Sequence, residues 1–479
     1  MPTTPPSPDA DALARALIDA IGRDSVLTDA DSLASHSTDM LRLKAARPRL
    51  VVRPADTAAL AAAMRVCAQH RAAVVPFGGN TGFCGGSMAD GSGRQVVVSL
   101  ARMNRVRDVD PLNNTMTVDA GCILAQLQAT ALEHDRVFPL SHGGEGSAQI
   151  GGCLSTNAGG NAVLRFGMAR DLVLGLEVVL PDGRVLDALR GLRKDNAGYD
   201  LKQLFLGTEG TLGIIAGAVL KLFPRPQARE TAMVAVPSVP AAVSLLAHLR
   251  SQVGDVVTAC ELLPRLGLAL FFETIGEVRE PFEQAHAWQV LVELESGSRH
   301  FRLRDALEEA LAGALDAGLA LDAVIAHSDA QRASLWKLRE GIALAAVADP
   351  SSLKNDQSVP CSKIPAFVDA GRALVESLVP GARCVPFGHI GDGNIHFNVW
   401  RPESMTPDAF MPHWPALLGG LEDLATSLGG SIAAEHGIGA SKRPSLARVK
   451  DAVSIDLMQR VKAAIDPDGR MNPGKVVPS

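Results

Sequence analysis

The spacing of apolar residues predicts alternating helices and strands in the N-terminal part of the chain. Helical spacing, in which apolar residues recur every three or four positions, runs through four segments. Valine-rich runs of strand length lie between them. Asp56 or Thr57 precedes the third helix and is of a type that caps helix N-termini. The predicted helices cover 9–21, 29–35, 56–70 and 123–134, and the predicted strands cover 50–54, 73–76, 95–100 and 115–118.

Three glycine-rich stretches lie beside these apolar strands, at 77–87, 143–160 and 207–215. Loops of this composition leave backbone N–H groups free to surround an anion such as a phosphate. Most glycine-rich loops are simply turns, but three of them in one region favour a large phosphate-bearing cofactor. Neither GxGxxG nor GxxxxGK[ST] occurs, which excludes the usual nicotinamide and P-loop fingerprints.

A hairpin pattern spans Val385 to Trp400, with the sequence VPFGHIGDGNIHFNVW. The turn residues Gly391–Asn394 are flanked by strand-like segments, which predicts that His389 lies opposite His396. Opposed residues have Cβ atoms roughly 5 Å apart, so two imidazoles there can share one metal ion. Alternation places Asn398 on the same face as His396 and leaves Ile395, Phe397 and Val399 toward a core. The alternative is a chance pair of histidines beside a turn.

A candidate third ligand lies downstream, where Glu435 and His436 follow an apolar run and precede two glycines. A catalytic zinc site usually has three protein ligands and one open position. Taken alone, this Glu-His pair is more typical of a surface loop than of a metal site.

Composition and length limit the class of protein. A chain of 479 residues with 47% hydrophobic and 20% charged residues predicts a globular protein of two or more domains. A net charge of −6 argues against nucleic acid as the main partner, and no apolar run reaches the ~20 residues of a membrane span. The acidic, proline-rich start predicts a short disordered lead rather than a signal peptide, and seven scattered cysteines predict reduced thiols, so we expect a cytoplasmic protein.

Several long motifs identify a family. The chain resembles the FAD-linked D-2-hydroxyacid dehydrogenases, which are vanillyl-alcohol-oxidase-like flavoproteins, in colinear order from about residue 30 to residue 479. The motifs are PFGGNTG, IGGCLSTNAGG, LGLEVVLPDG, RKDNAGYDLKQLFLGTEGTLGII, GHIGDGNIHFNV, AAEHGIG and MNPGK.

The resemblance implies an α+β, two-domain PCMH-type fold. It implies an FAD-binding domain over 1–224, a substrate domain with an antiparallel sheet over 225–430, and a C-terminal segment, 431–479, that packs back on the FAD domain. Phe223–Pro226, which contains two prolines, is typical of a linker at this boundary. From 261 to 347 the spacing itself predicts mostly amphipathic helices.

The resemblance also implies the cofactor-binding residues. Asn80 stands where some relatives attach flavin through a histidine, so non-covalent FAD is expected. The implied FAD-binding residues are Pro76, Gly78, Gly79, Asn80, Thr81, Gly82, Gly85, Gly86, Ser87, Gly146, Ser147, Gly151, Gly152, Thr156, Asn157, Gly159, Gly160, Glu209, Gly210, Ile215 and Asn472.

The metal and substrate residues follow from the same motifs. His389, His396 and Glu435 match ligands of zinc or a similar divalent metal, and His436 matches a catalytic base that also contacts substrate. The implied substrate contacts are Arg339, Lys354 and Asn398. Ala343 departs from the pattern of relatives that take hydroxyglutarate, which have threonine there.

The implied reaction oxidises D-2-hydroxyglutarate to 2-oxoglutarate by hydride transfer from C2 to flavin N5, with D-lactate or another D-2-hydroxy acid as the alternative. Electron-transfer flavoprotein or a quinone is the expected acceptor, and a homodimer the expected assembly. Two other classes remain: a zinc hydrolase, which would be colourless, and an inactive flavin-binding subunit, which would lack the metal ligands present here.

Overall fold

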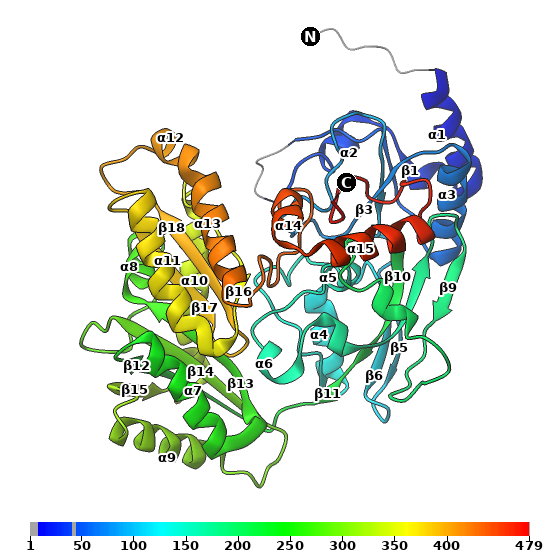
Figure 1. Ribbon diagram of the computed structural model, residues 1–479. Helices are drawn as coiled ribbons and strands as arrows, with labels where there is room; N and C mark the ends of the chain where they lie inside the picture. The colour runs from blue at the N-terminus through cyan, green and yellow to red at the C-terminus, as the bar shows by residue number, and fades with distance from the viewer. Residues whose placement is uncertain (1–7, 41–44, 479) are drawn as a thin grey trace. The chain divides into compact units, whose positions relative to one another are not determined.

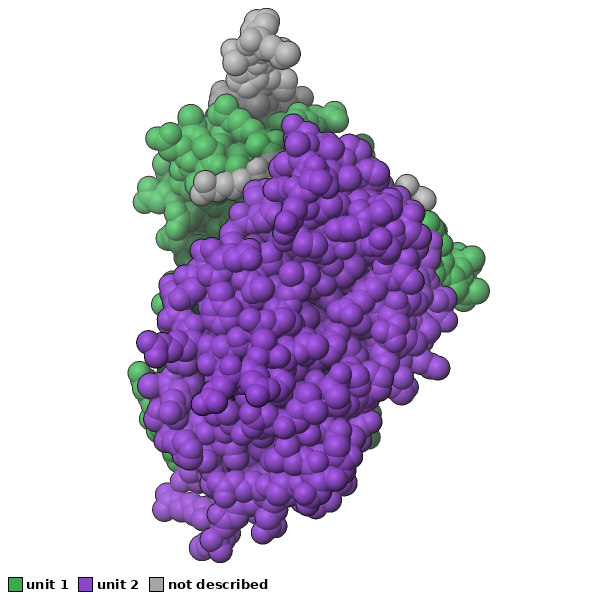
Figure 2. Space-filling model, turned by 90° about the vertical axis from the view of Figure 1, so that its left-hand side faces the viewer, with its two compact units in different colours: residues 1–160, 168–225, 435–479 green, residues 161–167, 226–434 purple. Residues whose placement is uncertain are grey.

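A computed structural model describes residues 8–40 and 45–478. The chain forms two compact units (Figure 2): unit 1 comprises residues 1–160, 168–225 and 435–479, and unit 2 comprises residues 161–167 and 226–434. The first seven residues of the predicted N-terminal lead lie outside the described residues, and helix begins at Pro8. All seven cysteines lie in the described part of the chain, and none forms a disulfide.

Unit 1 contains two main sheets and a two-stranded ladder. The first has the order β1-β2-β4-β3, in which β2, β4 and β3 are parallel. The second, β5-β6-β10-β8-β9, is antiparallel, and β11 pairs with β7. The strands are β1 (Val26–Leu27), β2 (Leu50–Val52), β3 (Val74–Phe77), β4 (Val96–Ser99), β5 (Val106–Asp110), β6 (Thr115–Asp119), β7 (Arg136–Val137), β8 (Val173–Val179), β9 (Val185–Ala188), β10 (Ile214–Lys221) and β11 (Phe223–Pro224).

The helices of unit 1 follow the predicted pattern closely. The helices predicted over 9–21, 29–35, 56–70 and 123–134 are confirmed within one or two residues, and Asp56 caps α3 by accepting the N–H of Ala59 at 2.8 Å. The four predicted strands correspond to β2, β3, β4 and β6. The helices are α1 (Pro8–Ile21), α2 (Ala30–Ala34), α3 (Thr57–Gln69), α4 (Leu124–Glu133), α5 (Ile150–Thr156), α14 (Arg443–Val449) and α15 (Ala452–Ile465).

Residues 435–479 belong to unit 1. After α15, Met471 forms a parallel bridge with Val74 of β3. The N–H of Val74 donates to the carbonyl of Arg470 at 2.8 Å, and the N–H of Asn472 donates to the carbonyl of Val74 at 2.7 Å. The tail therefore continues the first sheet beside the strand that leads into the first glycine-rich loop.

Unit 2 is built on a seven-stranded sheet of order β15-β12-β14-β13-β17-β18-β16, with helices on both faces (Figure 1). The strands are β12 (Ala228–Val236), β13 (Val257–Pro264), β14 (Trp288–Ser296), β15 (Asp322–Ile325), β16 (Gln357–Ser358), β17 (Arg383–His389) and β18 (Asn394–Trp400). The helices are α6 (Val163–Phe166), α7 (Val239–Val253), α8 (Arg265–Thr274), α9 (Leu303–Asp316), α10 (Asp329–Ala348), α11 (Ile364–Leu378), α12 (Pro407–Phe410) and α13 (Trp414–Ser427).

Alternation along these strands separates two cores. Residues such as Val290 and Val292 face one core, which α7, α9, α11 and α13 complete, whereas Leu291 faces a second core completed by α8 and α10. Each face of the sheet is therefore covered, which explains why the central strands are buried along both faces. Ile395, Phe397 and Val399 are fully buried in the first core, as predicted.

The prediction of mostly helices over 261–347 is wrong for three segments. β13 continues to Pro264, and β14 and β15 also lie in this range, while α8, α9 and α10 are helical. β13 and β14 are covered on both faces, so they are largely apolar and lack the period-two signal, and their short apolar runs are ambiguous in sequence. β15 is a four-residue edge strand, too short to show a period.

Candidate functional site

The β17–β18 hairpin carries His389 and His396, but its register differs from the prediction. Phe387, not His389, lies opposite His396, because the turn occupies residues 390–393 and Gly393 donates its N–H to the carbonyl of His389 at 3.1 Å. Gly393 has φ +90°, a conformation that favours glycine and fixes the turn one residue earlier than predicted. The pairing shifts by two residues, so side-chain faces are preserved.

The two imidazoles therefore remain neighbours. His389 and His396 lie diagonally on one face of the hairpin, with ring centroids 5.7 Å apart and an interplanar angle of 71°. This is the face of the sheet toward α10, since Val385 and Phe387 of β17 belong to the core that α10 completes. The prediction that His389 lies directly opposite His396 is wrong. The prediction that the two rings are neighbours on one face is confirmed, because it depends only on the face.

A buried carboxylate stands on the other side of His389. Glu261 of β13 pairs directly with His389 in the sheet register, and its Oε1 lies 2.7 Å from His389 Nδ1. Its Oε2 accepts from Nε of Arg339, on α10, at 2.7 Å. Burial by itself would raise the pKa of Glu261, but the electrostatic attraction and hydrogen bonds of His389 and Arg339 outweigh it and lower that pKa to about 2. Glu261 is therefore a carboxylate at neutral pH.

The other two predicted substrate contacts are Asn398, on β18, and Lys354, in the segment before β16. Asn398 is buried, and its Oδ1 accepts the backbone N–H of Asn355 at 3.0 Å. Lys354 donates from Nζ to the carbonyls of Asp349 and Ser352 and to Ser352 Oγ, at 3.0–3.1 Å. Burial lowers the pKa of Lys354. The three donors of this ammonium thus have partners within its own loop.

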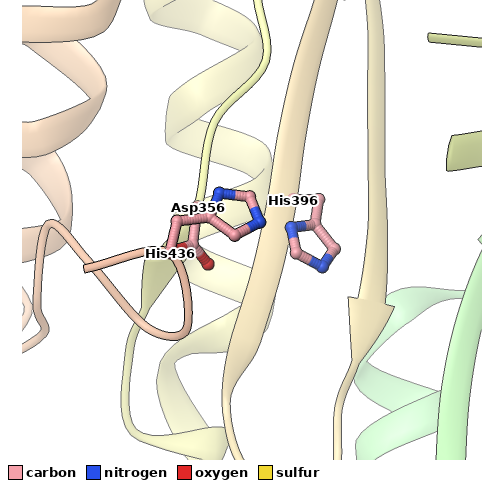
Figure 3. A group of neighbouring side chains, drawn as sticks. All are labelled: Asp356, His396 and His436. Carbon is pink, nitrogen blue, oxygen red and sulfur yellow. The ribbon is translucent and has the colours of Figure 1, made fainter. Parts of the chain in front are cut away.

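Asp356 fixes the loop that leads to Glu435 and His436. Its Oδ1 accepts from Asn394 Nδ2 at 3.1 Å, and its Oδ2 accepts the backbone N–H of Ala434 at 3.2 Å. Figure 3 shows Asp356 with His396 and His436 as a group of neighbouring side chains.

Two sets of donor atoms have a composition suited to a divalent metal. One is His389, His396 and Glu435, the predicted set, and the other is Asp356, His396 and His436. Two imidazoles and a carboxylate are the donor types that zinc binds in catalytic sites, so the residues fit such an ion. His396 belongs to both sets.

The three glycine-rich loops of unit 1 lie against one another. A Cβ on Gly79 would lie 2.1 Å from the carbonyl oxygen of Ser147, and one on Gly210 would lie 2.7 Å from Pro76 Cγ. These contacts join the first loop to the second and the third. Asn472 joins the tail to them by donating from Nδ2 to the carbonyls of Gly86 and Glu209, at 2.9 and 2.7 Å.

The same loops have features of a cofactor cradle. A Cβ on Gly82, Gly146 or Gly152 would meet no described atom within 4 Å, so their backbone faces open space. Among the described residues, Gln149 Oε1 and Asn472 Oδ1 are buried acceptors with no hydrogen-bond partner. Open backbone together with unpaired buried acceptors fits a large polar cofactor such as FAD.

The carboxylates of Glu209 and Glu435 have contacts in this region that the motifs did not indicate. The carboxylate of Glu209, expected at the cofactor, accepts the backbone N–H groups of Ile438 and Gly439. Gly159 lies against Glu435, since a Cβ there would be 2.9 Å from Glu435 Oε1. Glu261 and Asp356 were not predicted as site residues; the signal for Glu261 is one charge inside an otherwise uncharged, largely apolar run, VVTACELLP.

Comparisons with known proteins show the family of this chain. The family model described as FAD binding domain matches residues 48–189, and the model of FAD linked oxidases, C-terminal domain, matches residues 225–476. A D-2-hydroxyglutarate dehydrogenase of Stutzerimonas stutzeri (strain A1501) is 36% identical over 454 residues, which is 94% of this chain and 96% of the relative. The mitochondrial D-2-hydroxyglutarate dehydrogenase of Rattus norvegicus is 36% identical over 459 residues, 95% of this chain and 83% of the relative.

The chain belongs to the FAD-linked D-2-hydroxyacid dehydrogenase family. Membership of this family confirms the prediction of an enzyme that uses FAD.

The fold comparison confirms the predicted class. The structure of p-cresol methylhydroxylase with substrate bound superposes with a TM-score of 0.77 over 98% of this chain and 97% of that one, at 16% identity. The fold is thus the two-domain PCMH-type fold of vanillyl-alcohol-oxidase-like flavoproteins. Among the described residues, no helix combines the length and apolar character that crossing a membrane requires.

Proposed function

We propose that this enzyme oxidises D-2-hydroxyglutarate to 2-oxoglutarate, using non-covalent FAD and zinc or a similar divalent metal. The names of the two relatives support the substrate. In this proposal residues 1–224 form the FAD-binding domain and residues 225–430 form the substrate domain. Residues 431–479 form a C-terminal segment that packs on the FAD-binding domain. An electron-transfer flavoprotein or a quinone re-oxidises the flavin of a cytoplasmic homodimer.

The observation that carries the metal role is the pair of imidazoles on one face of the β17–β18 hairpin. Their centroids are 5.7 Å apart, and His389 is held through Nδ1 by the carboxylate of Glu261. A histidine whose Nδ1–H donates to a carboxylate presents Nε2 to a metal, which is the usual arrangement around zinc. Glu435 supplies the third donor of the predicted set.

The protein's own residues supply binding and proton transfer. When bound, FAD supplies a hydride acceptor at N5 and the divalent ion supplies Lewis acidity. His436 takes the proton of the 2-hydroxyl as general base. Arg339 and Lys354 hold the distal carboxylate of the dianion by charge-assisted hydrogen bonds, with Asn398 beside them. To bind substrate, Lys354 exchanges one of its contacts to Asp349 or Ser352.

The substrate is tested by anaerobic bleaching of the flavin. The oxidised enzyme is mixed with D-2-hydroxyglutarate, L-2-hydroxyglutarate, D-lactate and D-malate, and flavin absorbance is followed by stopped flow. We expect D-2-hydroxyglutarate to give the largest rate constant divided by half-saturation concentration. Preference for D-lactate would overturn the dicarboxylate assignment and leave the alternative, a monocarboxylate dehydrogenase, which Ala343 favours because it lacks the hydroxyl expected there.

A further inference from the structure

Glu261 makes two buried hydrogen bonds that link a sheet to a helix. It lies on β13 directly opposite His389 on β17, and its two carboxylate oxygens each have one partner, His389 Nδ1 and Arg339 Nε, both at 2.7 Å. The side chains of Glu261, His389 and Arg339 are 1%, 5% and 8% exposed. All three lie within unit 2, so the cluster is a property of that unit alone.

The chemistry of this cluster fixes which imidazole nitrogen carries the proton. A carboxylate only accepts hydrogen bonds, so Nδ1 of His389 is the protonated nitrogen toward Glu261. A neutral ring then has its lone pair on Nε2, where Arg339 Nη2 lies at 3.1 Å and can donate. Nε2, the nitrogen that would bind a metal, is therefore also the atom next to the positively charged guanidinium of Arg339.

We propose that Glu261 is a positioning residue for both halves of the substrate site: it sets the metal-binding tautomer of His389 and orients the guanidinium of Arg339. This inference rests on the proposed function, in which His389 binds the metal and Arg339 binds a substrate carboxylate. When a cation takes Nε2, Arg339 Nη2 loses its acceptor and becomes free for the carboxylate, while Nε stays bound to Glu261. Metal binding and preparation of the carboxylate site are thus coupled through one side chain.

Only a carboxylate satisfies both partners. In Glu261→Gln the amide oxygen can accept from His389 Nδ1–H, but the amide nitrogen then faces the N–H of Arg339 Nε, donor to donor. The flipped amide satisfies Arg339 and donates to His389 Nδ1, which favours a proton on Nε2 and blocks the metal-binding lone pair. Either amide orientation therefore impairs the His389 tautomer or the orientation of Arg339, although glutamine has nearly the same shape as glutamate.

Glu293 offers a matched control on the neighbouring strand. It lies on β14 on the same face of the sheet, and its Oε2 accepts from Trp336 Nε1 of the same helix, α10, at 2.8 Å. It also accepts from Thr231 Oγ1 at 2.8 Å. Glu293→Gln therefore also perturbs a largely buried link between sheet and α10, without touching His389 or Arg339.

The first measurement is zinc affinity, determined on metal-stripped, FAD-loaded protein by competition with a chromophoric chelator. We expect Glu261→Gln to raise the zinc dissociation constant roughly 10–100-fold, the range typical for loss of such a carboxylate, and Glu293→Gln to change it less than threefold. The second measurement is binding of 2-oxoglutarate to the oxidised, zinc-loaded enzyme, followed by the flavin spectrum. Glu261→Gln should raise that dissociation constant about tenfold.

The third measurement reads the tautomer directly and does not depend on zinc. Long-range proton–nitrogen spectra of metal-free protein labelled at histidine, assigned with His389→Gln, should show His389 protonated at Nδ1 in wild type and in Glu293→Gln. In Glu261→Gln the population should move toward the Nε2–H form. If Glu261→Gln does not fold, Glu261→Asp replaces it: it keeps the charge, but its shorter side chain cannot reach both partners, so it should weaken zinc and 2-oxoglutarate binding more than Glu293→Gln does.

The outcomes separate this inference from the proposed function. Wild-type zinc and 2-oxoglutarate affinities in a folded Glu261→Gln protein, with an unchanged tautomer, would overturn the inference and leave the metal centre standing. Equal losses in Glu261→Gln and Glu293→Gln would also overturn it, by indicating a general effect of packing. A wild-type protein that binds no zinc would instead refute the proposed metal centre, and this inference with it.

Discussion

The carboxylate of Glu209 accepts the backbone N–H of Ile438 at 2.7 Å, and thereby holds the chain two residues after His436. The same carboxylate accepts the N–H of Gly439 through both oxygens, at 2.9 and 3.1 Å. Gly437 has φ +73°, and a Cβ there would lie 2.7 Å from Glu209 Oε1, so the loop closes tightly around this side chain. Glu209 is thus a structural anchor for the loop that carries the proposed base.

Glu209→Ala is expected to destabilise the enzyme and to misplace this loop. One buried and one partly buried N–H group lose their acceptor, at ~1–3 kcal/mol each, so the free energy of unfolding should fall by about 2–6 kcal/mol. Chemical denaturation followed by fluorescence measures this change. Glu309→Ala, at an exposed position of α9, serves as control and should have almost no effect. Equal stability of the two variants would show that Glu209 is not an anchor.

Flavin should be released by acid. Asn80 occupies the position where a covalent tether would require histidine, and its side chain is engaged with the carbonyl of Thr38 and with Ser87 Oγ at 2.8 and 2.9 Å. After precipitation with trichloroacetic acid we expect FAD in the supernatant, identified by chromatography. A yellow pellet would contradict non-covalent binding.

Removal of metal should abolish turnover while leaving the flavin spectrum intact. The flavin spectrum should persist because the metal and FAD are held by different residues. His389 and His396 belong to unit 2, whereas the predicted FAD loops belong to unit 1. Dialysis against a chelator followed by steady-state assay tests this, with zinc added back to restore activity. His396→Ala should reproduce the loss and His300→Ala, at an exposed position, should not. Full activity in protein shown by elemental analysis to be metal-free would rule the metal role out.

His436→Ala should slow flavin reduction by D-2-hydroxyglutarate ~10²–10⁴-fold, the usual effect of losing a general base. The imidazole is packed against the ring of Phe83, with centroids 4.8 Å apart, which fixes its position. Single-turnover stopped flow isolates the reductive step from re-oxidation. A reduction rate within a few-fold of wild type would exclude His436 as the base.

Lys354→Met should discriminate between dicarboxylates and monocarboxylates. Loss of a charge-assisted hydrogen bond is worth ~1.5–3 kcal/mol, so kcat/KM for D-2-hydroxyglutarate should fall roughly ten- to hundredfold. D-lactate lacks the distal carboxylate, and its kcat/KM should change much less. Because Lys354 also holds the loop at Asp349 and Ser352, the melting temperature is measured in parallel with that of Lys363→Met, at an exposed lysine. Equal losses for both acids would mean that Lys354 acts only as this loop contact.

Much of this protein could be predicted from short stretches of its sequence. Helices over 9–21 and 56–70 and the strands of the first parallel sheet follow from local spacing and capping, which depend on neighbours a few residues away. The colinear motifs predicted the family, its fold and its use of FAD, and the comparisons confirm these three predictions. Strand alternation predicted that His396 lies on the face away from Ile395 and Phe397, which are buried in the core.

What the local pattern could not supply is the identity of partners far away in sequence. Alternation has a period of two, so it fixes the face of His389 but not its register, and the hairpin shifted by two residues without changing any face. Glu261 meets His389 across 128 residues and Glu209 meets Ile438 across 229, because sheet pairing and loop closure bring them together. The sequence determined the donor types and the faces on which they lie; only tertiary packing decided which buried carboxylate each of them contacts.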